Sequence, residues 1–192
     1  MTKIVVTGPV PEPALSALRA SGAEVVVGAA DTTPADELHA LVAGADAVLA
    51  LLTARVDAAF LDAAGPQLRI VANVAVGYNN VDVAACAARD VVVTNTPGVL
   101  TDATADIALA LVLMATRRLG EGERVIRSGQ AWQWGMLFHL GTGIQRRRLG
   151  IVGMGQIGQA LARRATACGM TIAYSNRTPV APAIEAMLGA TT

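Results

Sequence analysis

The segment from residue 149 to residue 178 restricts the possible folds of this chain more than any other part. It reads LGIVGMGQIGQALARRATACGMTIAYSNRT, so two short apolar runs flank a glycine-rich turn and a helical pattern. The apolar runs predict strands at Leu149–Val152 and Met170–Tyr174. Between them, apolar side chains recur at helical spacing: Ile157, Leu161, Ala165 and Cys168. The order strand, helix, strand predicts a β-α-β unit, with Gly169 at the end of its helix.

Three glycines occupy the turn between the first strand and the helix, in the pattern G-x-G-x-x-G. Gly153 allows a tight turn, Gly155 removes a Cβ where a pyrophosphate would approach, and Gly158 lets the helix pack close to the sheet. The helix start offers free N–H groups and a positive dipole end to phosphates. The pattern predicts a dinucleotide site that contains Gly153, Met154, Gly155, Gln156, Ile157 and Gly158. A structural β-α-β unit without a ligand is the alternative, but it gives no reason for three glycines at these places.

The residues after the second strand bear on which dinucleotide would bind. NAD sites of this kind place an Asp or Glu about 20 residues beyond the glycines, where it accepts hydrogen bonds from ribose hydroxyls. This chain has Ser175 there, followed by Asn176, Arg177 and Thr178. A guanidinium beside neutral hydrogen-bonding side chains suits a 2′-phosphate. These four residues are predicted to bind the cofactor and to favour NADP, with NAD as the alternative; on the other reading Arg177 is an ordinary solvated loop residue.

Composition excludes several classes of function. The net charge is zero and aromatic residues make up 3% of the chain, which argues against a nucleic-acid partner. The longest apolar run, Ile107–Ala115, is shorter than the roughly 18 residues that a membrane span needs. Cys86 and Cys168 lie far apart, without metal-ligand or redox spacing. We therefore expect no metal site and no membrane association, and, because no signal peptide is visible, a cytoplasmic protein.

The first hundred residues alternate short apolar runs with helical patterns, which predicts a parallel, doubly wound α/β sheet. Hydrophobic residues make up 53% of the chain and charged residues 16%, as strands buried on both faces require. The predicted strands are Lys3–Thr7, Glu24–Val27, Asp46–Leu51, Leu68–Asn73 and Val91–Thr94. The predicted helices are Glu12–Ser21, Pro34–Ala43, Asp57–Ala64 and Val81–Arg89. Thr33, Asp57 and Asn80 are expected to cap the last three helices.

A turn at Asn95-Thr96-Pro97-Gly98 ends this region, and a long helix follows from about Thr101 to Arg118. Its run Ile107–Ala115 is apolar all round, so we expect it to be buried on most sides, at a junction between domains or subunits. The chain is therefore predicted to contain a first domain, residues 1–100, and a second domain, residues 101–192, which begins with this linking helix.

Two further segments carry a resemblance to a known family. They read NVAVGYNNVD, Asn73 to Asp82, and NTPGVLTDATAD, Asn95 to Asp106. With these and the glycine-rich unit, the chain resembles the D-2-hydroxyacid dehydrogenases, in particular the glyoxylate/hydroxypyruvate reductase branch, over essentially its whole length. The resemblance implies a flavodoxin-like substrate domain with a parallel sheet, followed by a partial Rossmann nucleotide-binding domain. It also implies hydride transfer between NAD(P)H and a small 2-oxo or 2-hydroxy acid.

The resemblance assigns roles to individual residues as well. It implies that backbone N–H groups at Val76 and Gly77 bind the substrate carboxylate, which suits a glycine-containing strand exit with outward-facing amides. It implies that Leu51 lies near the substrate and Thr104 near the nicotinamide; on the other reading, the Thr104 hydroxyl bonds its own helix backbone. It further implies a homodimer, with the tryptophan-containing loop 129–143 near the partner subunit or packed as an ordinary surface loop.

The catalytic Arg, Glu and His of the family lie after the second strand of the nucleotide domain, so we expect no catalytic residue within this chain and no activity from it alone. Leu149–Val152 would then lack a neighbour on its far side, and the helix near Ala181–Leu188 would have little to pack on. These expectations describe a C-terminally truncated form of a longer gene product. The alternative function is a non-catalytic nucleotide-binding or dimerisation module that uses the glycine-rich unit and the 101–118 helix.

Overall fold

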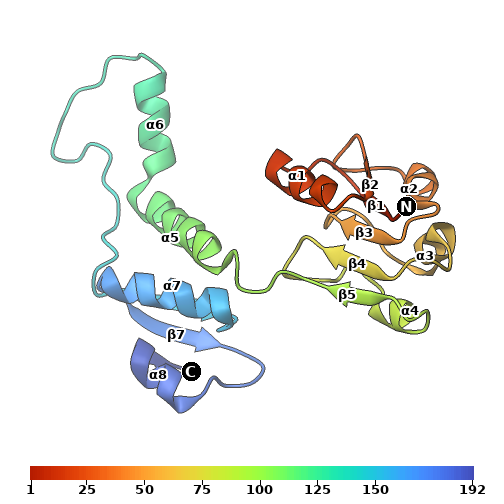
Figure 1. Cartoon of the computed structure of the whole chain (residues 1–192). Helices are drawn as coiled ribbons and strands as arrows, with labels where there is room; N and C mark the ends of the chain where they lie inside the picture. Colours follow the sequence, from red (N-terminus) through yellow and green to blue (C-terminus); the bar gives the residue numbers. More distant parts are fainter. The chain divides into compact units, whose positions relative to one another are not determined.

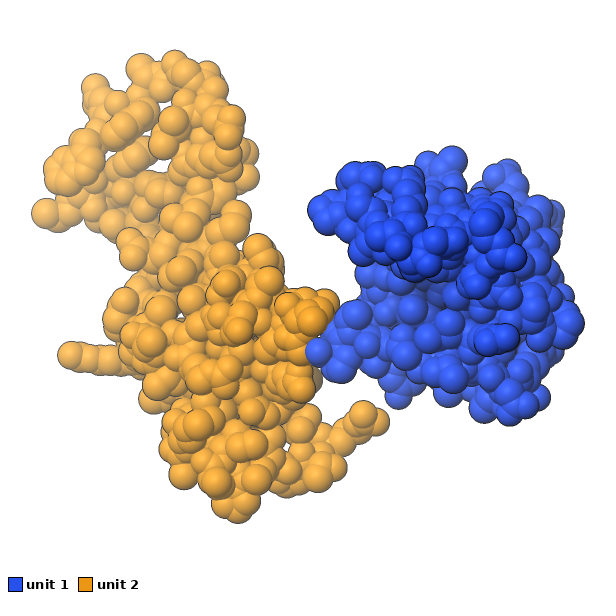
Figure 2. Space-filling view, in the orientation of Figure 1, with its two compact units in different colours: residues 1–97 blue, residues 98–192 orange.

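The computed structural model describes all 192 residues, which form two compact units, residues 1–97 and residues 98–192. Figure 2 draws the two units in different colours. Each unit contains a parallel β-sheet with helices packed on it, so the predicted α/β class is confirmed. The division at Pro97 and Gly98 lies within the turn that separates the two predicted domains. No helix combines the length and the hydropathy that a passage through a lipid bilayer demands.

The first unit is a five-stranded parallel sheet with strand order β2-β1-β3-β4-β5, the order of flavodoxin-like sheets. Its strands are β1 (Lys3–Val6), β2 (Glu24–Val27), β3 (Ala47–Ala50), β4 (Ile70–Asn73) and β5 (Val92–Thr94). Its helices are α1 (Glu12–Ala20), α2 (Ala35–Val42), α3 (Ala58–Ala64) and α4 (Val83–Ala87). Every predicted strand and helix of this region is present, and the carboxyl ends of all five strands meet at one edge of the sheet.

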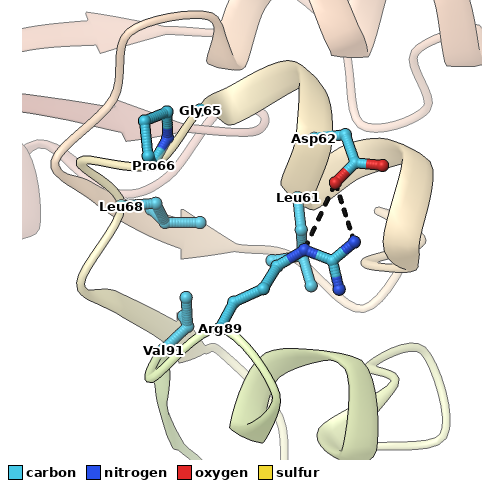
Figure 3. A pocket seen from close by; sticks show the side chains of 7 residues that line it. All are labelled: Leu61, Asp62, Gly65, Pro66, Leu68, Arg89 and Val91. Carbon is cyan, nitrogen blue, oxygen red and sulfur yellow. Dashed lines mark hydrogen bonds and ion pairs between the residues drawn. The ribbon is translucent and has the colours of Figure 1, made fainter.

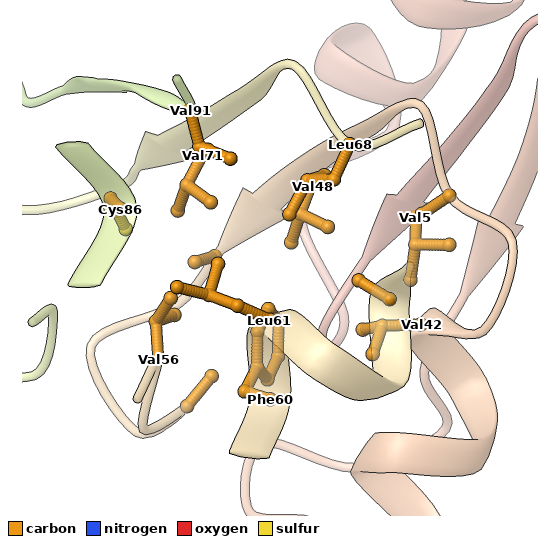
Figure 4. Packing of buried hydrophobic residues seen from close by; sticks show 14 of the residues in the cluster. Val5, Val42, Val48, Val56, Phe60, Leu61, Leu68, Val71, Cys86 and Val91 are labelled. Atoms are coloured by element: carbon orange, nitrogen blue, oxygen red, sulfur yellow. The ribbon is translucent and has the colours of Figure 1, made fainter. Parts of the chain in front are cut away.

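The helices of the first unit cover both faces of its sheet. Helices α2, α3 and α4 pack side by side on one face, and α1 lies on the other, as right-handed crossovers in this strand order require (Figure 1). Between α3 and the central strands, Phe60 contacts a core that includes Val5, Val48 and Val71, all of them fully buried (Figure 4). Burial of each such side chain contributes about 1.5–3 kcal/mol, so this core holds the strand ends in place.

Side-chain caps at two helix starts show which capping predictions were right. Asp57 caps α3, because its Oδ1 accepts a hydrogen bond from the Phe60 N–H at 3.1 Å. This bond is the main reason that the pKa of Asp57 lies below its usual range. The prediction for Asn80 was wrong: Asp82 caps α4 by accepting from the Ala85 N–H at 2.9 Å. The prediction for Thr33 was also wrong, because α2 follows Pro34 without a side-chain cap.

The second unit has a three-stranded parallel sheet of order β6-β7-β8. Its strands are β6 (Arg148–Val152), β7 (Thr171–Ser175) and β8 (Ala190–Thr191). Its helices are α5 (Thr101–Arg117), α6 (Leu119–Arg127), α7 (Gln156–Ala167) and α8 (Pro182–Leu188). Strand β6 is an edge strand, as expected, while α6 and β8 were not predicted. Gly169 follows α7 with φ +79°, which confirms its predicted role at the helix end.

The expectation that the last helix would have little to pack on was wrong. In α8, Leu188 is buried and Ile184 packs against the second core, which includes Ile151, Ile172 and Tyr174. The Tyr174 hydroxyl donates to Glu185 of the same helix at 2.6 Å. Strand β8 then pairs with β7, so β7 has a neighbouring strand on each side.

The apolar run of the linking helix was expected to be buried on most sides at a junction between domains or subunits, and the second unit by itself covers only one of its faces. Helix α5 packs along α7 on one face only, where Ala105 is buried and Val112 and Leu113 contact the second core (Figure 1). On the other face, Ile107 and Leu111 are 63% and 58% exposed. The helix is therefore apolar on a side that nothing within its own unit covers.

The face that α7 buries is built from smaller side chains than the sequence pattern indicates. Its fully buried residues are Gly158, Ala160, Ala162 and Ala165. Of the predicted stripe, Ala165 alone is fully buried, while Ile157, Leu161 and Cys168 are half-buried. Small side chains on this face allow α7 to approach both β6 and α5 closely.

Candidate functional site

The turn between β6 and α7 needs two of its three glycines, each for a different reason. Gly153 has φ +98°, a backbone conformation that other residues rarely adopt. A Cβ on Gly158 would overlap the carbonyl oxygen of Gly153, so no side chain fits there. Gly155 has neither constraint, because its φ is −76° and a Cβ there would meet no atom of the chain within 4 Å. The fold accounts for two of the glycines, and the third faces open space at the start of the helix.

The same turn presents a run of backbone N–H groups. The N–H groups from Met154 to Gly158 donate no hydrogen bond within the chain, and the helical ladder begins where the Gln159 N–H donates to the Gly155 carbonyl at 2.9 Å. The turn is exposed at Gly153, Gly155 and Gln156, whereas the Met154 side chain is buried in the second core. Met154 therefore anchors the turn and offers only its main chain. Such an array at a helix N-terminus can hold a phosphate.

The end of β7 lies beside this turn, because the Gly153 N–H donates to the Ser175 carbonyl at 2.9 Å. Ser175 and the three residues after it are exposed: Asn176, Arg177 and Thr178. Asn176 Nδ2 donates to the Thr178 carbonyl at 2.8 Å and shapes the loop, while the guanidinium of Arg177 forms no hydrogen bond or ion pair in the chain. The loop therefore offers hydroxyl and amide groups and one unengaged cation beside the glycine turn.

The carboxylate nearest along the chain, that of Glu185, is already engaged. It accepts the hydrogen bond of the Tyr174 hydroxyl at 2.6 Å, and the same hydroxyl accepts from the Val180 N–H at 3.1 Å. The bond to Glu185, together with burial, raises the pKa of Tyr174. Through these two hydrogen bonds, Tyr174 connects Val180, which follows the loop, to Glu185 of α8.

The first turn of α5 also lies at this end of the second unit. Arg164 of α7 donates from Nη2 to Asp102 at 3.0 Å and from Nε to Asp106 at 2.6 Å, and the Thr101 hydroxyl lies 3.4 Å from Gln156 Oε1. Thr104, one residue before the buried Ala105, is exposed and its hydroxyl forms no hydrogen bond to the helix backbone. This hydroxyl is therefore free to form a hydrogen bond with another molecule.

The first unit contains the other predicted residues, at the carboxyl ends of β3 and β4. Leu51 follows β3 and is half-buried, and its N–H donates to the buried Thr7 hydroxyl at 2.9 Å. Val76 and Gly77 lie in the loop after β4. Asn80 connects the two segments, because its Nδ2 donates to the Leu51 carbonyl at 3.4 Å and to the Ala54 carbonyl at 3.0 Å.

The N–H groups of Val76 and Gly77 donate no hydrogen bond within the chain. Their carbonyls, in contrast, are both engaged by asparagine side chains. Asn95 Nδ2 donates to the Val76 carbonyl at 2.8 Å, and Asn73 Nδ2 donates to the Gly77 carbonyl at 2.9 Å. Two adjacent amides held in this way can bind an anion such as a carboxylate.

The structure adds three asparagines to the site, Asn73, Asn80 and Asn95, that the sequence analysis did not assign to it. A signal for two of them was present: Asn73 ends a buried strand and Asn95 follows the next strand. Because β4 and β5 are parallel neighbours, their carboxyl ends must meet at one edge, where ligands of doubly wound sheets bind.

A hollow in the first unit lies at the wrong end of the sheet for such a site. Its volume is about 380 Å³, and an ion pair between Arg89 and Asp62 at 2.7 Å borders it (Figure 3). It is lined by Leu68, which precedes β4, and by Val91, which precedes β5. It therefore lies at the amino ends of the strands, opposite the asparagines and the free amides.

Comparison with known proteins shows which family this chain resembles. The family described as D-isomer specific 2-hydroxyacid dehydrogenase, catalytic domain, matches residues 4–191. A glyoxylate reductase of Thermococcus onnurineus is 42% identical over 193 residues, which cover 98% of this chain and 57% of the relative. The chain thus spans a little over half the length of this relative.

Solved structures show the same relationship. A protein of Thermus thermophilus is 42% identical, with a TM-score of 0.90 over 94% of this chain and 58% of its own. A putative D-isomer specific 2-hydroxyacid dehydrogenase, NAD-binding, of Polaromonas is 36% identical, with a TM-score of 0.87 over 97% of this chain and 58% of its own. The matched family covers nearly the whole chain. The sequence relative and the two structures are 36% to 42% identical to it. The chain therefore belongs to the family of D-isomer specific 2-hydroxyacid dehydrogenases.

Proposed function

We propose that this chain is part of an enzyme that uses NADPH to reduce a small 2-oxo acid, of the glyoxylate or hydroxypyruvate type, to the 2-hydroxy acid. The observation that carries the proposal is the run of unpaired N–H groups from Met154 to Gly158, beside a loop with an unengaged Arg177 and no carboxylate of its own. Main-chain donors at a helix start suit a pyrophosphate, and a guanidinium suits a 2′-phosphate.

The bound cofactor would supply the hydride, and the residues of this chain would bind and orient the reactants. Gly155 would let the pyrophosphate reach the backbone, and Thr104 would contact the nicotinamide end. Val76 and Gly77 would hold the substrate carboxylate through their N–H groups, with Leu51 beside the substrate. Correct orientation of the two reacting carbons accounts for much of the rate in such reactions.

Proton transfer to the carbonyl oxygen requires an acid that we do not assign to this chain. His39 lies in α2, and His139 Nε2 contacts the Arg118 carbonyl at 3.1 Å in the second unit. Neither histidine lies in the loops described above. We propose that the acid and the residue that orients the substrate carbonyl come from outside these 192 residues, and that the chain alone has no turnover.

A homodimer is part of the proposal. The second unit exposes large apolar side chains on α5, on α6 and in the loop after α6: Ile107, Leu111, Leu119, Ile126, Trp132, Trp134, Met136 and Leu137. An exposed apolar surface of this kind is typical of an interface between subunits. Sedimentation equilibrium of the wild type and of Leu111→Glu tests it, since a dimer should dissociate in the variant.

The decisive experiment compares cofactors and substrates. Titration of the chain with NADPH and with NADH should give tighter binding of NADPH. A protein of full family length that contains this sequence should oxidise NADPH with glyoxylate or hydroxypyruvate. Binding of cofactor without turnover of any 2-oxo acid by that longer protein would instead favour the non-catalytic nucleotide-binding module.

A further inference from the structure

We infer that Asn95 is a positioning residue that sets the direction of the Gly77 N–H and thereby the fit of the substrate carboxylate. The inference rests on the proposed function, in which the N–H groups of Val76 and Gly77 bind that carboxylate. No local sequence pattern connects Asn95 to Gly77, because Asn95 lies 18 residues later and in a different loop.

The geometry of the peptide bond connects the two residues. The carbonyl of Val76 and the N–H of Gly77 belong to one planar peptide group, and all peptide bonds of the chain are trans. In a trans peptide these two groups point in opposite directions. Since Asn95 Nδ2 holds the Val76 carbonyl at 2.8 Å, it also fixes the opposite side of the same plane, where the Gly77 N–H lies.

Three successive peptide planes of the loop are held in this manner. The Ala75 carbonyl accepts from the Thr96 N–H at 2.9 Å, which fixes the Val76 N–H. The Val76 carbonyl accepts from Asn95, and the Gly77 carbonyl accepts from Asn73 at 2.9 Å. The first plane is thus held by a main-chain donor, the Thr96 N–H. The third is held by the side chain of Asn73, which is 2% exposed. The middle plane alone depends on an exposed side chain.

The hydrogen bond from Asn95 also affects the strength of the anion site. A peptide group whose carbonyl accepts a hydrogen bond becomes polarised, and its N–H then donates more strongly. Asn95 is neutral, so it provides this effect without a charge that would compete for the carboxylate. Gly77 has no side chain and is exposed, and its N–H has no hydrogen-bond partner within the chain.

The test uses a protein of full family length that contains this chain, ¹⁵N-labelled, and oxamate as a stable analogue of a 2-oxo acid, because the residue proposed to orient the substrate carbonyl lies outside the 192 residues. Amide signals are followed during titration for the wild type, for Asn95→Leu, which keeps the approximate size but cannot donate, and for Asn79→Ala. Asn79 is the matched control, because it is exposed in the same loop and forms no hydrogen bond in the chain. Residual dipolar couplings of the Gly77 N–H report its direction without ligand.

The expected result separates the two amides. In the wild type and in Asn79→Ala, the signals of Val76 and Gly77 move together and saturate. In Asn95→Leu, the dissociation constant rises at least about tenfold, the Gly77 response is lost, the Val76 response persists, and the Gly77 coupling changes while those of β4 do not. A general loss of folding would disturb both amides and the strand.

Two different failures are distinguishable. If oxamate moves neither amide in the wild type, the carboxylate site itself is wrong and the role of Asn95 falls with it. If the wild type responds and Asn95→Leu binds equally well with an unchanged Gly77 coupling, the carboxylate site stands and the inference about Asn95 is overturned.

Discussion

Asn73 and Asn80 exchange hydrogen bonds through their side-chain amides. Asn80 Nδ2 donates to Asn73 Oδ1 at 3.0 Å, and Asn73 Nδ2 donates to Asn80 Oδ1 at 3.3 Å. The pair connects Asn73, the last residue of β4, to Asn80, which lies two residues before the cap of α4. Asn80 Nδ2 also donates to the Ala54 carbonyl at 3.0 Å. The loop that holds Val76 and Gly77 is therefore held at both ends by one partly buried network of hydrogen bonds.

Loss of this pair should destabilise the first unit. Asn80→Ala leaves the buried amide of Asn73 without one partner, which costs about 1–3 kcal/mol. Native-state hydrogen exchange of the β4 amides measures the change, because it reports on the first unit by itself. Asn79→Ala serves as the control and should cost less than about 0.5 kcal/mol, as for an ordinary surface position. Equal stabilities of the two variants would contradict the network.

Gly155 and Gly158 should respond differently to the same substitution. Gly158→Ala places a Cβ against the Gly153 carbonyl, so the helix must shift, at a cost of about 1–3 kcal/mol. Gly155→Ala meets only open space and should leave the melting temperature unchanged, while it weakens cofactor binding because the Cβ occupies the path of the pyrophosphate. Thermal unfolding and NADPH titration of both variants test this. Unchanged NADPH binding in Gly155→Ala would count against the pyrophosphate site.

The Asp57 cap should make the first unit sensitive to acid. The hydrogen bond from the Phe60 N–H lowers the pKa of Asp57 in the folded state. Its contribution is therefore complete above the unfolded pKa of about 4 and is lost as the pH falls through the folded value. Asp57→Ala should cost about 1 kcal/mol at neutral pH. Asp57→Asn keeps a capping oxygen without the titration, so urea unfolding of this variant should depend less on pH between about 5 and about 2.

Arg164 should hold α5 against α7. Its ion pairs with Asp102 and Asp106 involve a largely covered guanidinium but exposed carboxylates, so we expect Arg164→Met to lower the stability of the second unit only slightly. Arg163→Met is the control, since Arg163 is exposed and has no partner. The difference should shrink in about 1 M salt, where the screening length falls to about 3 Å. A difference that persists unchanged in salt would show that packing of the side-chain stem is responsible.

Arg177 should determine the preference between the two cofactors. Arg177→Ser removes the only cation of the loop after β7, so the affinity for NADPH should fall about tenfold while that for NADH stays the same, because a charge-assisted hydrogen bond contributes about 1.5 kcal/mol. Arg163→Ser controls for the loss of a surface charge elsewhere. If both cofactors bind equally before and after the substitution, Arg177 has no part in recognition of the 2′-phosphate.

Local pattern was sufficient for most elements of this chain. Strands such as Glu24–Val27 and the turn of Gly153 follow from side-chain periodicity and from backbone conformation, which depend on neighbours in sequence. Asp57 was recognised as a cap for the same reason. The short strand β8 has no such signal, because its two residues become a strand only through pairing with β7.

Interactions between residues far apart in the sequence could not be predicted from local patterns. Asn80 looks like a helix cap in sequence, but its amide is taken by carbonyls 26 and 29 residues earlier, and Asp82 caps α4 instead. The apolar run of α5 looks like a buried helix, yet only the face toward α7 is covered. Side-chain periodicity specifies which residues can be buried or bonded, since it arises within one element. Which of them are buried or bonded depends on what the rest of the chain brings against them, as the asparagine amides that orient Val76 and Gly77 show.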